Sequence, residues 1–243
     1  TGVQTCALPI SADTSHQVTI GGANTLTINA TAANGNPLGN GITVDSGSGA
    51  HTISANVILG NNQTWTNNSI STLTVGGIIS GAPNLTIAGA GTILFSGTNT
   101  YGGTTTLNAG ILSIKNNTAL GTPVGGTTVY AGGSLELQNS ITVGAEPLSI
   151  TGTGSAVNGA LRNLSGNNTF GGLVTVTGGS ATIQSDAGLL TLNGANAISA
   201  AAQAVTVTGA GNTTVTGIIA GAAGSITKAG AGTLEFSEIG RAH

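Results

Sequence analysis

The segment Phe95–Ile114, FSGTNTYGGTTTLNAGILSI, recurs without a gap at Leu164–Ile183 as LSGNNTFGGLVTVTGGSATI, 69 positions later. A third, partial copy appears near the end of the chain, where Thr216–Ser237 (TGIIAGAAGSITKAGAGTLEFS) repeats Gly76–Ser96 (GGIISGAPNLTIAGAGTILFS). Self-similarity at a regular spacing is the sequence signature of a protein built from stacked repeats. The chain is therefore predicted to be a solenoid.

Short alternating segments predict strands throughout these repeats. Runs such as Thr25–Asn29, Leu85–Ile87 and Val205–Thr208 alternate apolar residues with threonine or asparagine, and clusters of Gly, Asn and Ser separate the runs. Period-two alternation with many β-branched residues is typical of half-buried strands. Only Ala197–Ala204 has a composition compatible with a helical turn. The fold class is therefore predicted to be all-β.

Superposing the repeat copies predicts which side chains face the core. Glu235 occupies the position of Leu94, so this position is expected to face solvent, whereas Ile93 and Phe95 on either side of it face inward. Inward positions exchange threonine for valine, as at Thr105, and leucine for alanine between copies. The core is therefore expected to be narrow and built of small aliphatic side chains.

The repeat spacing favours a parallel β-helix over other all-β folds. A sandwich has about seven strands around one core, and a propeller blade is shorter and usually richer in aromatic residues than the 2% found here. Coils of roughly 20–25 residues would fit three to a repeat, each burying the face of the last. We expect one β-helix fragment without caps, of about ten coils, over residues 11–237. In it the turn residues Asn99 and Asn168, with the threonines that follow them, would stack as side-chain ladders.

The two ends of the chain are complementary at the DNA level. If Ile239–His243 is encoded by ATCGGAAGAGCACAC followed by G, the opposite strand encodes Thr5–Ile10 in frame. Two unrelated protein ends have no reason to be reverse complements, and the DNA resembles a sequencing adapter. Residues 1–10 and 238–243, together with the only cysteine, Cys6, are therefore expected to be adapter-derived and to carry no information about the native fold. The chain would then be an internal piece of a longer protein.

Composition excludes several classes of function. With only 4 basic residues in 243, the chain cannot neutralise a phosphate backbone, so nucleic-acid binding is excluded. Low charge with abundant Leu, Ile and Val disfavours disorder. No apolar run approaches the roughly 20 residues that cross a bilayer, so the fragment is not expected to span a membrane. The acidic residues between the two ends are dispersed: Asp13, Asp45, Glu136, Glu146, Asp186 and Glu235.

The units Ala88–Ile114 and Lys228–Ser237 resemble the autotransporter-associated β-strand repeat. That pattern begins Lys-x-Gly-x-Gly-Thr-Leu and continues through Gly-x-Asn-Thr-Tyr-x-Gly. The departures are mild, because Ile87 replaces the lysine in the first copy and Phe170 replaces the tyrosine in the second. The positions expected to matter structurally are Gly89, Gly91, Phe95, Asn99, Tyr101, Gly103, Gly110, Asn168, Phe170, Gly172, Gly230, Gly232 and Phe236.

The resemblance implies a right-handed parallel β-helix passenger at the surface of a Gram-negative bacterium. It also implies a partner, a C-terminal outer-membrane β-barrel of the same protein that is absent from this sequence. The expected function is a non-catalytic stalk or adhesion module, with any surface ligand left open. The alternative is a fragment of a polysaccharide-degrading β-helix enzyme, which would need clustered carboxylates. No cofactor and no metal are expected.

Local motifs for chemistry are few. Asp45-Ser46-Gly47 with His51 nearby resembles the surroundings of a serine-protease nucleophile, but the glycine expected before Asp45 is missing, so a Gly/Ser turn is expected. Calcium-binding repeats would need Gly-Gly-x-Gly-x-Asp, whereas the aspartates here are isolated.

Two surface alternatives stay open. Trp65 and Tyr130 could serve as sugar platforms, although a lone aromatic more often packs against a coil edge. Outward threonines, as in Val205–Thr208, could form ranks that bind ice or a crystalline surface, although the coil length varies too much for a flat lattice.

Overall fold

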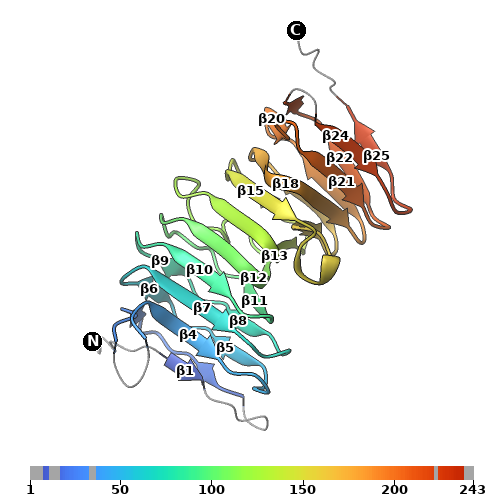
Figure 1. Cartoon of the computed structure of the whole chain (residues 1–243). Coiled ribbons are helices and arrows are strands. Elements are labelled where there is room, and N and C mark those ends of the chain that lie inside the picture. Colours follow the sequence, from blue (N-terminus) through green and yellow to red (C-terminus); the bar gives the residue numbers. More distant parts are fainter. Residues whose placement is uncertain (1–7, 11–16, 33–36, 222–223, 238–243) are drawn as a thin grey trace.

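The computed structural model describes residues 8–10, 17–32, 37–221 and 224–237, which form one elongated stack of strands (Figure 1). Every strand pairing among these residues is parallel. The stack makes about 9 turns, close to the expected ten. The prediction of an all-β parallel solenoid is therefore confirmed.

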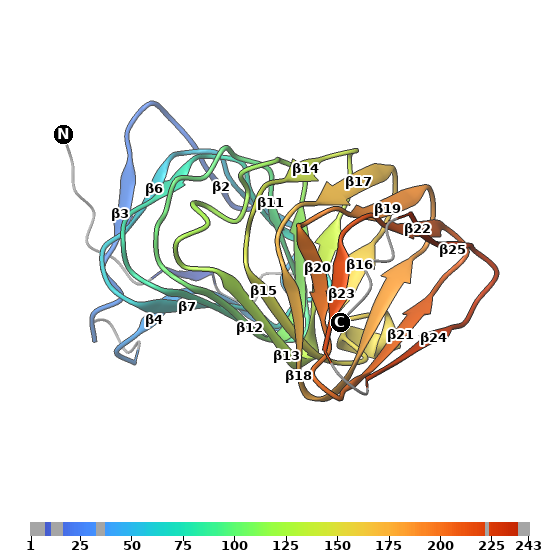
Figure 2. The same cartoon turned by 90° about the horizontal axis from the view of Figure 1, so that it is seen from above.

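The strands of successive coils lie on three faces, which enclose a common interior (Figure 2), although the coils between β9 and β14 have no strand on the third face. Face 1 contains β1 (Leu8–Ile10), β4 (Asn40–Val44), β7 (Gln63–Asn67), β10 (Leu85–Ala88), β15 (Leu148–Gly152), β20 (Asn196–Ser199) and β23 (Ile218–Ala220). Face 2 contains β2 (Thr19–Ile20), β5 (His51–Ile53), β8 (Leu73–Val75), β11 (Thr92–Phe95), β16 (Leu161–Asn163), β21 (Ala204–Thr208) and β24 (Ser225–Lys228). Face 3 contains β3 (Leu26–Ile28), β6 (Val57–Leu59) and β9 (Ile79–Ser80), followed by β14 (Thr142–Val143), β17 (Asn167–Phe170), β19 (Leu189–Leu192), β22 (Asn212–Val215) and β25 (Leu234–Phe236).

Three long strands turn the corner between faces 1 and 2. They are β12 (Thr105–Ile114), β13 (Thr127–Leu137) and β18 (Val174–Ser185). The first residues of β12 pair with β10 on face 1, and its last four pair with β11 on face 2. The corner is where the register shifts, with extra residues in β13 and in β18. The two faces are therefore continuous through these coils.

The core runs along the inside of all three faces. Inward residues alternate with partly exposed ones, so that Ile93 and Phe95 are buried while Leu94 between them is partly exposed. Trp65 of face 1 meets Phe95 of face 2 edge to face, with ring centroids 5.8 Å apart. The orientations expected from superposing the repeats are confirmed, and Leu234 of the last described coil is only half-buried. Burial of this continuous apolar strip drives coil stacking.

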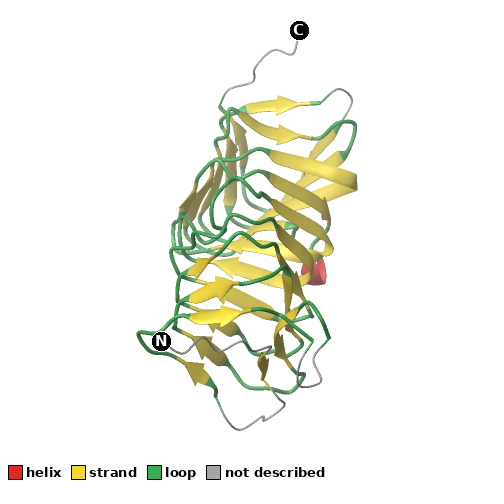
Figure 3. Cartoon of the chain, turned by 90° about the vertical axis from the view of Figure 1, so that its left-hand side faces the viewer, coloured by secondary structure: helices red, strands yellow, loops and turns green. Residues whose placement is uncertain are grey.

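The one helical turn among the described residues is η1 (Ser155–Val157), which projects from the side of the stack (Figure 3). The helical turn that the composition of Ala197–Ala204 allowed does not form. Ala197 and Ile198 are buried in β20, which pairs with β18 and β23, and a short turn leads on to β21. Pairing with two neighbouring coils overrides the helical preference of alanine.

Part of the N-terminal segment contributes a strand to face 1. Leu8–Ile10 forms β1 and pairs with Ile42–Val44 of β4, although it belongs to the segment with adapter-like coding. This pairing does not bear on the origin of the residues, so adapter derivation stays a prediction. Residues 1–7, 11–16 and 238–243, on which much of that prediction falls, lie outside the described residues. None of the described residues forms a helix long and apolar enough to cross a membrane.

Candidate functional site

The motif asparagines join neighbouring coils. Asn99 is buried, its Oδ1 atom accepts the N–H of Ile79 at 2.9 Å, and its Nδ2 atom donates to the carbonyl of Ala119 at 2.7 Å. Asn168 likewise accepts the N–H of Ile141 at 2.7 Å. The expected side-chain ladder is therefore wrong in detail, because the amides of Asn99 and Asn168 bond to backbone groups, that of Asn168 also to the side chain of Asn163, and the two do not stack on each other. Face 3 has no paired strands between β9 and β14. The asparagine amides bond to backbone groups there that strand pairing leaves without a partner.

The motif glycines lie where the backbones of adjacent coils approach most closely. A Cβ atom on Gly172 would stand 1.7 Å from the carbonyl oxygen of Glu146, and one on Gly103 would stand 2.1 Å from that of Pro83. Any side chain at these corners would collide with the preceding coil. The same collision with backbone, at under 3 Å, holds for Gly89, Gly91, Gly110, Gly230 and Gly232.

The motif aromatic residues belong to the core. Phe95, Tyr101 and Phe170 are fully buried, and Phe236 in the last described coil is half-buried. The Tyr101 hydroxyl lies 2.7 Å from Oγ1 of Thr105, which satisfies its polar atom inside the solenoid. These residues therefore act as packing groups, and none of them is presented to a ligand.

Thr105 pairs in register with Thr127 of the next coil. The two threonines begin a column of polar side chains inside the otherwise apolar interior. The Thr127 hydroxyl donates to Oε1 of Glu146 at 2.8 Å. Burial raises the pKa of Glu146 to about 7, and its charge in turn helps to raise the pKa of Tyr101, which burial raises most. Glu146 also lines a cavity of about 100 Å³ with Thr118, Pro123 and six other residues. Sequence reasoning missed this column, although threonine at the inward position where Val174 stands in the second copy was a signal of it.

A charged cluster lies on the outer side of face 2. Register places Glu136 beside Arg162, and the guanidinium of Arg162 pairs with both Glu136 and Asp186. The expectation that the acidic residues are dispersed is therefore wrong for these two, which strand stacking brings together. Burial raises the pKa of Glu136, while Arg162 opposes that rise. The three side chains neutralise one another across coils and bear no free basic or nucleophilic group.

The protease-like segment does not form a catalytic arrangement. The Nδ1 atom of His51 accepts the backbone N–H of Val18 at 3.0 Å, and its Nε2 atom is buried without a partner, so neither nitrogen bonds to Ser46. Burial lowers the pKa of His51, because it disfavours the charged ring. Asp45 lies half-buried at the end of β4. The segment is a turn, as the sequence indicated.

The two candidate sugar platforms differ in exposure. Trp65 is fully buried, and its Nε1 atom donates to Oε1 of Gln63 at 2.8 Å, so it is a core residue. Tyr130 is 52% exposed at the corner of β13. Within the described part of the chain, no group of three or more His, Cys, Asp or Glu side chains is placed to hold a metal ion.

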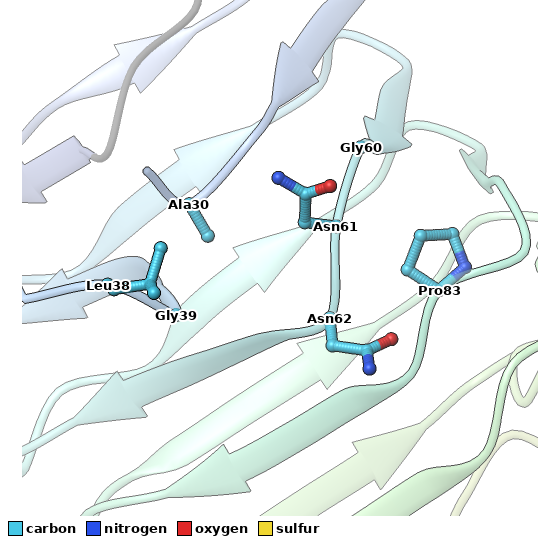
Figure 4. A pocket seen from close by; sticks show the side chains of 7 residues that line it. All are labelled: Ala30, Leu38, Gly39, Gly60, Asn61, Asn62 and Pro83. Carbon is cyan, nitrogen blue, oxygen red and sulfur yellow. The ribbon is translucent and has the colours of Figure 1, made fainter. Parts of the chain in front are cut away.

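A groove of about 440 Å³ lies across the first coils (Figure 4). Its polar side chains already form hydrogen bonds between neighbouring coils, because Asn61 donates to the carbonyl of Asn29 and Asn62 accepts the N–H of Asn84. The groove contains no ionisable group, so it offers no general acid or base. Its lining residues are Ala30, Leu38, Gly39, Gly60, Asn61, Asn62 and Pro83.

Comparison with known proteins agrees with the repeat architecture. Residues 85–114 and 163–180 match the model of the passenger-associated-transport-repeat family. The Adhesin BmaC autotransporter of Brucella suis biovar 1 (strain 1330) is 38% identical over 116 residues, which make up 47% of this chain and 3% of that protein. No solved structure matches the chain significantly. These matches confirm the resemblance of the chain to the repeat region of autotransporter passengers.

Proposed function

We propose that the chain is a structural stalk and adhesion module in the passenger of an autotransporter, displayed on the surface of a Gram-negative bacterium. The observation that carries this proposal is the unbroken parallel solenoid, whose single core extends from Leu26 to Val215. A rod in which each coil contacts only its neighbours can project a binding region without needing a globular centre. The relative that the chain resembles is itself an adhesin autotransporter.

The proposed role is non-catalytic. Glu136 and Asp186, the two acidic residues that stacking brings together, are both paired with Arg162. A glycoside-cleaving pair needs one carboxyl group free to donate a proton and another free to attack or to activate water. Turnover of plant or bacterial polysaccharides by the purified chain, abolished by Glu136→Gln or Asp186→Asn, would contradict this part of the proposal.

The display experiment places the whole chain between a signal peptide and the C-terminal barrel of an autotransporter in a Gram-negative host. Ile150 is fully buried, whereas its neighbour Ser149 is partly exposed, so Ile150→Asp and Ser149→Asp form a matched pair. We expect the unmodified chain and Ser149→Asp to reach the surface as protease-resistant material, and Ile150→Asp to be degraded there. Cells that carry the chain should also adhere to coated surfaces more than cells with the barrel alone. Failure of the unmodified chain to reach the surface folded would refute the proposed role.

A further inference from the structure

The outer side of face 1 carries an unbroken row of hydroxyl side chains. Each of these residues is partly exposed, while the side chains beside it on the same strand, such as Leu107 and Val129, are buried. Strands stack about 4.8 Å apart, so the row presents evenly spaced hydroxyls over roughly 29 Å along the solenoid axis. Register pairs connect its members coil by coil, and we call them the hydroxyl row: Thr64, Thr86, Thr106, Thr128, Ser149, Thr175 and Ser199.

An exposed aromatic ring stands beside the middle of this row. Tyr130 lies two residues beyond Thr128 on β13 and therefore on the same outward side. The register between β12 and β13 shifts at this point, so that Tyr130 and Ala131 together lie opposite Asn108. Tyr130 is 52% exposed, whereas Tyr101 is fully buried in the core.

The side chains that register places beside Tyr130 on neighbouring coils include neutral hydrogen-bonding groups. Asn108 is exposed on the preceding coil. On the following coils the hydroxyls of Thr151 and Thr177 lie 2.9 Å apart, and both residues are at least partly exposed. The hydroxyl row contains no charged residue, and the cluster of Glu136, Arg162 and Asp186 lies on face 2. This surface combines one amphipathic ring with a regular array of donors and acceptors.

The uncharged hydroxyls and the single exposed ring of this surface favour some classes of binding partner over others. A polyanion would find no basic side chain on the row to replace its counterions. An apolar partner would find one aromatic ring and the 37% exposed side chain of Leu173 beside the row, but otherwise hydroxyls, which lose hydrogen bonds to water if they are buried unpaired. A neutral carbohydrate offers both complements, because its C–H face can cover an aromatic ring while its hydroxyls exchange hydrogen bonds with threonine and asparagine.

We propose that face 1, from β7 to β20, binds an extended, uncharged polysaccharide that lies along the solenoid axis, with one sugar ring on Tyr130. The inference deepens the proposed adhesive role by naming the class of partner. Its test uses the purified chain and does not depend on display at a cell surface. If the unmodified chain binds no neutral polysaccharide but still reaches the cell surface folded, this inference alone is overturned.

The experiment is affinity electrophoresis of the full chain in native gels that contain hydroxyethyl cellulose, mannan or starch, with heparin as the anionic comparison. Mobilities are compared with those in gels without polysaccharide, and thermal melting confirms that each variant is folded. The test variants are Tyr130→Ala and Thr128→Lys. The matched control is Thr191→Lys, because Thr191 occupies an outward threonine row on face 3, between Thr169 and Thr214.

We expect at least one neutral polysaccharide to retard the unmodified chain, with an apparent Kd that rises at least tenfold in both test variants and is unchanged in Thr191→Lys. Retardation by heparin alone, or by none of the four polymers, would overturn the proposal. Undiminished binding by Tyr130→Ala and Thr128→Lys, or equal loss in Thr191→Lys, would do the same.

Discussion

The carboxyl group of Glu146 accepts a hydrogen bond from the hydroxyl of Thr127 at 2.8 Å inside the solenoid. Burial raises the pKa of this carboxyl to about 7 from an ordinary value of 4.5, so between these two pH values the folded chain holds a proton there that the unfolded chain releases. The stability from this group is fully present below about pH 4.5 and is lost as the pH rises through about 7.

Glu146→Gln should remove this pH dependence while it keeps an oxygen for Thr127. Thermal melting of the two proteins between pH 5 and pH 8 measures the effect. We expect the melting temperature of the unmodified chain to fall, relative to that of Glu146→Gln, as the pH rises. Other titrating groups cancel in the comparison. Parallel curves for the two proteins would show that the carboxyl keeps its ordinary pKa.

Replacing a coil-bridging asparagine should destabilise the solenoid. Asn99→Ala leaves the N–H of Ile79 and the carbonyl of Ala119 without their side-chain partner, at a cost of about 2 kcal/mol in the free energy of unfolding. Asn108→Ala is the matched control, because Asn108 is exposed, and its expected effect is about 0.5 kcal/mol or less. Urea unfolding followed by circular dichroism compares them. Equal midpoints for both variants would refute the bridging role.

An added methyl group should destabilise the solenoid far more at Gly172 than at Gly144. Gly172→Ala would place a Cβ atom 1.7 Å from the carbonyl oxygen of Glu146, and because that atom is backbone, relief requires the coils to move apart. We expect a cost of about 3 kcal/mol. A Cβ atom on Gly144 would meet nothing within 4 Å, so Gly144→Ala should be neutral or slightly stabilising. Chemical denaturation measures the free energy of unfolding of both variants. An unchanged free energy of unfolding in Gly172→Ala would contradict the close contact between these coils.

The repeat made the fold predictable, whereas contacts between coils were harder to foresee. Alternation in one copy and the Leu94/Glu235 exchange were enough to assign the inner and outer sides of β11 and β25, because side-chain direction in a strand is a local property. Which residues meet across coils depends on register, and coil length varies. Hydrogen-bonded partners stand 20 residues apart at Asn99 and 27 apart at Asn168.

The candidate sites likewise depend on contacts between coils that the sequence does not show. Glu136 and Asp186 look isolated in the sequence, and only the stacking of β13, β16 and β18 places them on either side of Arg162. Tyr130 was recognisable as an aromatic of uncertain exposure. Its outward side follows from the local alternation after Thr128, whereas the one-residue register shift beside it is not visible in any local pattern.

The central claim, a continuous parallel stack of coils, is tested most directly by distances along the hydroxyl row. Cysteines introduced at Thr86 and Ser199 in a Cys6→Ser background can carry spin labels for pulsed electron paramagnetic resonance. These residues are five coil steps apart by register, which corresponds to about 24 Å between backbones. Moving the first label to Thr64 adds one step. The stack predicts narrow distance distributions, the second longer by about 5 Å. Broad distributions, or a second distance that is unchanged or shorter, would contradict it.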